Sequence, residues 1–363
     1  MKVLTLESGP TAGDEFRGTV LCQTLRRGPT SKAIVLRKGQ ILDDQDIEIL
    51  RRIEPQEVRV VRPEPGDLHE DDAGRRLAQA VAGPGVTLRG PIQSRFNLIA
   101  TVRGIVEVDV DLLNALNAIP DMSAFTVLPF QPVSPGDIVA GAKVIPLVTR
   151  REYVATAERI AREHQPIIRV KPFQPRRVGV ISKQRPDPPL RQRFEQILQR
   201  KLDWYGAPLG LIQYTEPDLG SVETGFRQVL ADGADLIITA GSNSADPCDS
   251  LLVAVEALGG HVEVRGTPTH PGSFFWLAYL EDRAIFGMPS CGAYSDSTVV
   301  DLLLPRVLAG ERLSRRQIAE LGVGGLFERG MSARFPAYAI DESEHDVRAN
   351  PAERTDGAGE KLQ

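Results

Sequence analysis

Two carboxylates lie in a loop of small residues in the last third of the chain. Asp246 and Asp249 belong to the run Ala-Gly-Ser-Asn-Ser-Ala-Asp-Pro-Cys-Asp at positions 240–249. Small side chains let backbone N–H groups approach a phosphate closely. Either carboxylate could hold Mg²⁺, or polarise a hydroxyl or a water molecule beside that phosphate. The loop therefore indicates phosphate-ester chemistry, with these two carboxylates as candidate catalytic residues.

Structural roles are open for the same residues. Asp246 precedes Pro247 and could begin a turn, whereas Asp249 could be the N-cap of a following helix, a role worth about 1 kcal/mol. Cys248 and Cys291 lie in candidate loops, but the role of a buried small hydrophobe is favoured for both. For the other polar residues of these loops, an anion contact and an exposed loop position are both open: Lys183, Arg185 and His270.

The elements around the loop determine what it can contact. Residues 235–239 form an apolar run typical of a buried strand, and residues 250–258 predict a helix that stops at two glycines. Two more small-residue loops lie further along the chain, at 266–273 and, after the predicted strand at 284–287, at 287–295. Successive parallel strands end at one edge of a sheet, so we expect the three loops to meet there.

The second half of the chain predicts an α/β fold. Apolar strand-like runs at 178–181, 209–214, 235–239 and 284–287 alternate with helical patterns, as buried parallel strands do. Such a series predicts a three-layer α/β/α sandwich with a mostly parallel sheet.

Four segments are predicted from composition and pattern. Prolines near 172–176 indicate a domain boundary. We expect a small α+β module at 1–66, a mixed α+β module with a connector at 67–172, and the α/β/α domain at 173–330. The polar tail at 331–363 is predicted to be disordered.

Composition excludes several classes of protein. The 363 residues are 42% hydrophobic and 25% charged, with a net charge of −5 and only 6% aromatic residues. A nucleic-acid-binding protein usually has a basic surface and aromatic side chains on which bases stack. This chain is acidic and poor in aromatic residues, so we expect no nucleic-acid partner. No apolar run approaches the about 18 residues of a membrane helix, and no signal-peptide core is present, so a cytoplasmic protein without a membrane partner is predicted. Three cysteines and five scattered histidines predict neither a disulfide framework nor a zinc site.

Residues 176–327 resemble the molybdopterin-binding domain of molybdopterin adenylyltransferases and molybdopterin molybdenumtransferases. The pattern is a strand, then Thr239-Ala240-Gly241, a loop with Asp246, a helix ending in Gly-Gly, then Pro271-Gly272-Ser273, then Gly-Met-Pro-Ser-Cys at 287–291. Residues 1–330 as a whole are similar to full-length molybdopterin-binding proteins.

The resemblance implies roles for residues of this chain. The pocket for the pterin phosphate or the nucleotide would be lined by Thr239, Gly241, Ser242 and Asn243. Asp246 would be the acidic residue at the metal and the phosphate, with Asp249 beside it. The pterin dithiolene would be covered by Gly272, Ser273, Pro289, Ser290 and Cys291. Implied ligands are molybdopterin or its adenylylated form, Mg²⁺ and ATP, and implied partners are a molybdoenzyme and further copies of the chain in a homo-oligomer.

Three functions follow from the resemblance. The first is a molybdopterin-binding protein of molybdenum cofactor biosynthesis, with adenylyl transfer or molybdenum insertion as its reaction. The second is a carrier or insertion factor without turnover. It is favoured by departures from the catalytic pattern, such as Ser273 in the place of a lysine and Ala240 in the place of a glycine. The third is a nucleotide pyrophosphatase of the same fold, for which we would expect more carboxylates in the loops.

Overall fold

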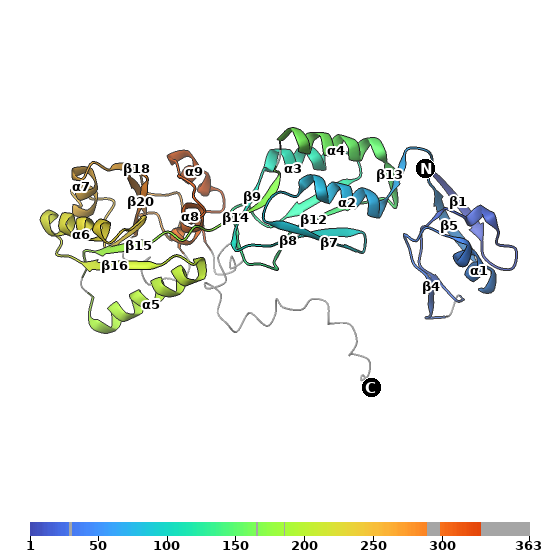
Figure 1. Cartoon of the computed structure of the whole chain (residues 1–363), viewed down its shortest axis with the longest axis horizontal. Coiled ribbons are helices and arrows are strands. Elements are labelled where there is room, and N and C mark those ends of the chain that lie inside the picture. The colour runs from blue at the N-terminus through green and yellow to red at the C-terminus, as the bar shows by residue number, and fades with distance from the viewer. Residues whose placement is uncertain (29–30, 165, 185, 289–297, 328–363) are drawn as a thin grey trace. The chain divides into compact units, whose positions relative to one another are not determined.

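The computed structural model of the chain describes residues 1–28, 31–164, 166–184, 186–288 and 298–327 (Figure 1). These form two compact units. One comprises residues 1–102, 106–129 and 134–171, and the other comprises residues 103–105, 130–133 and the described residues from 172 onward. The tail predicted at 331–363 lies outside the described residues. None of the helices in the described ranges combines the length and apolarity that a bilayer crossing requires.

The chain up to residue 172 is built from short strands and four α-helices among its described residues. In chain order its elements are β1 (Lys2–Glu7), η1 (Asp14–Phe16), β2 (Val20–Leu21), β3 (Leu25–Arg26), β4 (Ile34–Leu36), α1 (Asp44–Arg52), β5 (Glu57–Arg62), β6 (Asp67–His69), α2 (Glu70–Val81), β7 (Val86–Ile92), β8 (Arg95–Ala100), β9 (Gly104–Val108), α3 (Val110–Asn117), β10 (Met122–Thr126), β11 (Pro132–Val133), β12 (Ile138–Val144), β13 (Val148–Arg150), α4 (Arg151–His164) and β14 (Ile168–Pro172).

Two sheets organise the first unit. β5 lies between β1 and β2, and its apolar side packs on α1, whose first turn is closed by a capping box from Asp43. The larger sheet has the order β10-β12-β8-β7, and α2 packs along one of its faces. A bidentate ion pair between Arg76 and Glu158 joins α2 to α4.

The second unit contains a six-stranded sheet between two layers of helices. Its elements are β15 (Val178–Ser182), α5 (Pro188–Tyr205), β16 (Leu209–Tyr214), α6 (Leu219–Ala231), β17 (Leu236–Ala240), α7 (Ser250–Ala257), β18 (His261–Arg265), β19 (Trp276–Leu280), β20 (Arg283–Met288), α8 (Val299–Leu308), α9 (Arg315–Ala319) and η3 (Glu320–Gly322). The strand order is β16-β15-β17-β20-β19-β18. The first four strands are parallel, and β19 and β18 continue the sheet antiparallel.

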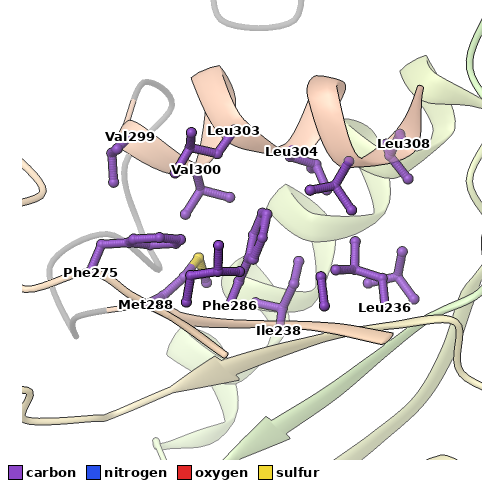
Figure 2. Close-up of a cluster of buried hydrophobic side chains, with 14 of the residues drawn as sticks. Leu236, Ile238, Phe275, Phe286, Met288, Val299, Val300, Leu303, Leu304 and Leu308 are labelled. Atoms are coloured by element: carbon purple, nitrogen blue, oxygen red, sulfur yellow. The ribbon is translucent and has the colours of Figure 1, made fainter. Parts of the chain in front are cut away.

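Alternate side chains of the central strands enter two separate cores. Leu236 and Ile238 of β17 pack with α5 and α8, as Figure 2 shows for α8. Ile237, between them, packs with α6 and α7 on the other face. Because both faces are covered, the strand is apolar except for Thr239. The predicted α/β/α sandwich with a mostly parallel sheet is therefore confirmed.

Candidate functional site

The strand register brings the predicted loops to one edge of the second unit's sheet. Ser182 is opposite Ala240, which is opposite Met288, so β15, β17 and β20 end side by side. Trp276 is opposite Gly287, near the end of β20, and it begins β19. The loop between β18 and β19 therefore opens at this same edge. The predicted convergence is confirmed for the loops that follow β17 and β18, whereas residues 289–297 lie outside the described residues.

Asp249 holds the loop at 241–249 in place. One carboxylate oxygen, Oδ1, accepts the N–H of Leu251 at 3.0 Å and makes Asp249 the N-cap of α7. The other, Oδ2, accepts the N–H of Asn243 at 2.7 Å and a hydrogen bond from Lys183 Nζ at 2.5 Å. The Asp249 side chain is only 1% exposed. Both oxygens are thus used by the protein itself, and the N-cap interpretation of this residue is confirmed.

Lys183 brings the loop after β15 to the loop after β17. Its side chain is 16% exposed and is paired with Asp249, so it is neither a solvated charge nor a free cation. The two loops also touch at Gly241, whose φ is +83° and whose added Cβ would lie 2.8 Å from Gln184 Cγ. Arg185 lies outside the described residues.

Asp246 is the accessible carboxylate of the site. It is exposed, and its Oδ1 accepts the N–H of Cys248 at 2.9 Å in a local turn. Its other oxygen accepts no hydrogen bond from the residues that the structure describes. Cys248 is exposed in the turn at 247–248, so the prediction that it is buried was wrong.

The side chain of Ser242 is held by a hydrogen bond from a buried tryptophan. Trp276 Nε1 donates to Ser242 Oγ at 2.7 Å, and both side chains are buried. The indole lies over Gly287, where an added Cβ would be 1.9 Å from the ring. Thr239 is also buried, and its hydroxyl donates to the carbonyl of Phe286 at 3.2 Å. The hydroxyl of Thr239 and the Ser242 side chain therefore serve the fold, and any ligand contact from Ser242 falls to its backbone.

Three serines present free donors around this loop. Within the described residues the backbone N–H groups of Ser242, Ser244 and Ser250 donate no hydrogen bond. The Ser250 hydroxyl is buried and has no partner there either. Ser250 is the first residue of α7, where the helix dipole is positive. Free N–H groups beside a helix N-terminus are the arrangement that binds phosphate in open α/β sheets.

Hydrogen bonds from threonine and serine hydroxyls within the loop between β18 and β19 fix its conformation. Thr267 Oγ1 lies 2.8 Å from Thr269 Oγ1 and donates to the carbonyl of Gly272 at 3.0 Å. Ser273 Oγ donates to the carbonyl of Thr269 at 2.5 Å. His270 is exposed, and its backbone pairs with Gly325 and Phe327. Gly272 and Ser273 thus shape the loop, whereas Pro289, Ser290 and Cys291 lie outside the described residues.

A separate cavity of about 480 Å³ opens at the opposite, amino edge of the sheet. It is lined by polar and charged residues: Gln174, Pro175, Arg176, Asp235, Glu281, Asp282 and Arg283. Much of this polar lining is already paired: Asp235 accepts the N–H of Arg177, and Arg283 is bonded to Glu281 and to the carbonyl of Ala234. None of the predicted site residues lines it, so we place the candidate site at the carboxyl edge.

Comparison with known proteins finds similar solved structures. Neither the protein-family models nor the curated proteins give a match. A molybdopterin biosynthesis MoeA protein from Pyrococcus horikosii is similar, with 13% identity over 69% of this chain and 80% of that chain, and a TM-score of 0.29. A molybdopterin biosynthesis protein from Mycobacterium abscessus matches at 14% identity over 33% of this chain and 85% of that chain, with a TM-score of 0.26. A CinA protein of unknown function from Thermoplasma acidophilum matches at 12% identity over 32% and 88%, also with a TM-score of 0.26.

Proposed function

We propose that the second unit binds molybdopterin at the carboxyl edge of its sheet, and that the protein acts in molybdenum cofactor biosynthesis. The observation that supports this most directly is that three backbone N–H groups, of Ser242 and Ser244 in the loop and of Ser250 at the start of α7, have no acceptor among the described residues. They would receive the phosphate of the pterin. The sequence resemblance supplies the identity of the ligand, because a phosphate cradle alone does not select a pterin.

A divalent cation fits beside this cradle through Asp246. Mg²⁺ is usually bound by one or two carboxylates together with substrate phosphates and water. Asp246 is exposed and retains one carboxylate oxygen for such a contact. When bound, Mg²⁺ would neutralise phosphate charge. Asp249 would support the cradle instead of the metal, since three donors already occupy its oxygens.

Two modes of action remain for this site. The first is adenylyl transfer to molybdopterin or molybdenum insertion into it, with Asp246 as the essential carboxylate. The second is a carrier that shelters the cofactor without turnover. The saturation of Asp249 favours the carrier, because it leaves Asp246 as the one free carboxylate of the described 241–249 loop.

The experiment is an equilibrium titration of the full chain with molybdopterin, with and without ATP and Mg²⁺. Saturable binding without release of AMP or pyrophosphate supports the carrier, and release of either product supports the transferase. Asp246→Asn separates the two further, because it should abolish metal-dependent turnover. An absence of molybdopterin binding by protein shown to be folded would defeat the proposal.

A further inference from the structure

The larger sheet of the first unit has one face on which α2 does not pack. Figure 1 shows α2 lying along the sheet that contains β7, β8 and β12. Side chains of a strand alternate between faces, so the register identifies the residues of the other face. One row across the four strands is Ile92, Arg95, Lys143 and Ser123, and the next row is Arg89, Asn97, Gly141 and Phe125. Arg89, Ile92 and Phe125, on the two edge strands, are exposed, whereas Asn97 on the central strand β8 is buried, so this face is accessible from its edges.

This face carries positive charge without acidic residues. Its two rows contain Arg89, Arg95 and Lys143 and no aspartate or glutamate. None of the three cations forms an ion pair with any residue in the described ranges. Arg95 Nε is buried and lacks an acceptor among them, and Lys143 reaches only the carbonyl of Gln93 at 3.4 Å. In a chain of net charge −5, three neighbouring cations without acids indicate an anionic ligand.

An aromatic ring lies beside these cations. Phe125 is 46% exposed, and its ring lies over Gly141, where an added Cβ would be 2.6 Å from the ring. The same Cβ would be 3.4 Å from Arg95 Cδ, so the phenyl ring and the arginine side chain lie next to each other above Gly141. Asn97, opposite Gly141 on the next strand, is buried at 2% exposure, so the ligand contacts fall to the cations and the phenyl ring. A planar ring can stack on the phenyl group while a phosphate meets the cations.

The area of this cationic face favours a small ligand over a macromolecule. Four strands about 4.8 Å apart and two rows about 7 Å apart give a patch of roughly 14 Å by 7 Å. A stable protein interface buries about 800 Å² on each partner, several times this area. We propose that this cationic face, made of Arg89, Arg95, Phe125 and Lys143, binds a small heteroaromatic phosphate ester of the nucleotide class. The site is independent of the pterin site proposed in the second unit.

AMP is the probe, used in calorimetric titrations of the full chain at low ionic strength. The double variant Arg95→Gln/Lys143→Gln should weaken AMP binding about tenfold or more, because it removes two charge-assisted contacts to the phosphate. Phe125→Leu should weaken it about fivefold through lost stacking. Arg37→Gln is the matched control, since Arg37 is an exposed arginine of the first unit that forms no ion pair within the described part of the chain. Adenosine alone and inorganic phosphate alone should each bind more weakly than AMP.

A third variant separates this site from the second unit. Ala245→Glu places a negative charge in the 241–249 loop and should leave AMP binding at the cationic face unchanged. Loss of AMP binding in Ala245→Glu but not in the double variant would overturn the proposal. So would equal AMP affinities of the double variant and Arg37→Gln, or no saturable AMP binding. Displacement of AMP by poly-glutamate with no effect of Phe125→Leu would point to an acidic protein partner and would also overturn it.

Discussion

Replacing Asp249 by asparagine tests whether this carboxylate is the structural centre of the candidate site. The substitution keeps the shape of the side chain and one acceptor for the N–H of Leu251. It removes the charge that pairs with Lys183 Nζ at 2.5 Å, and it leaves an amide where Oδ2 accepts the N–H of Asn243 at 2.7 Å. A partly buried cation then has no counter-charge, and one backbone donor loses its acceptor.

The expected cost follows from burial. Removing one partner of a buried ion pair typically costs 3–5 kcal/mol. The Lys183 side chain is 16% exposed and can be partly solvated, which places the cost at the lower end of this range. We therefore expect Asp249→Asn to lower the free energy of unfolding by about 3 kcal/mol. Asp218 is the matched control, because it is the N-cap of α6 and accepts the N–H of Ser221 at 2.9 Å from an exposed position. Asparagine is about as good an N-cap as aspartate, so Asp218→Asn should cost less than about 1 kcal/mol.

Urea unfolding followed by tryptophan fluorescence measures both costs in the full chain. The protein has two tryptophans, Trp204 and Trp276, and both lie in the second unit, so the signal reports on that unit. The double variant Lys183→Met/Asp249→Asn should recover part of the loss, because no unpaired charge then remains buried. Equal free energies of unfolding for Asp249→Asn and Asp218→Asn would refute the structural role of Asp249.

Two further predictions concern the same unit. Trp276→Phe removes the donor to Ser242 Oγ, so it should lower the free energy of unfolding by about 1 kcal/mol. The same urea assay measures this cost. A cost no larger than that of a substitution at an exposed position would contradict the prediction. Burial and a hydrogen bond to Glu195 raise the pKa of Tyr214 from 10.0 to about 12. The folded state therefore holds this proton more tightly, and its contribution to stability is full below pH 10.0 and is lost as the pH rises towards about 12. A tyrosinate absorbance titration of wild type and Tyr214→Phe should show one group missing near pH 12, and a missing group near pH 10 would refute the shift.

The parallel part of the sheet could be predicted because its strands are buried on both faces. β15, β17 and β20 are short, nearly continuous apolar runs between helical patterns, and such runs are typical of parallel strands. β18 and β19 were not predicted. β18 has histidine, glutamate and arginine at alternate positions, and β19 follows a long loop, so neither continues the strand–helix rhythm of the rest.

The loops of the site could be predicted, but not the contacts that fix them. The N-cap role of Asp249 is a local signal, since the residue directly precedes an apolar helical pattern. Its pairing with Lys183 joins residues 66 positions apart and depends on β15 being the neighbour of β17. The hydrogen bond from Trp276 to Ser242 likewise depends on β19 lying beside β20, and a single sequence gives no signal of this neighbour relation.

The central claim is that the loop at 241–249 receives the phosphate of molybdopterin. Its most direct test is an equilibrium titration of molybdopterin into wild type, Ala245→Glu and Ala33→Glu. Both alanines are exposed, but only Ala245 lies in the loop, so the two variants add the same charge at different places. We predict at least about tenfold weaker binding for Ala245→Glu, because a negative charge then faces the phosphate, and wild-type binding for Ala33→Glu. Equal molybdopterin affinities of all three proteins would contradict this account.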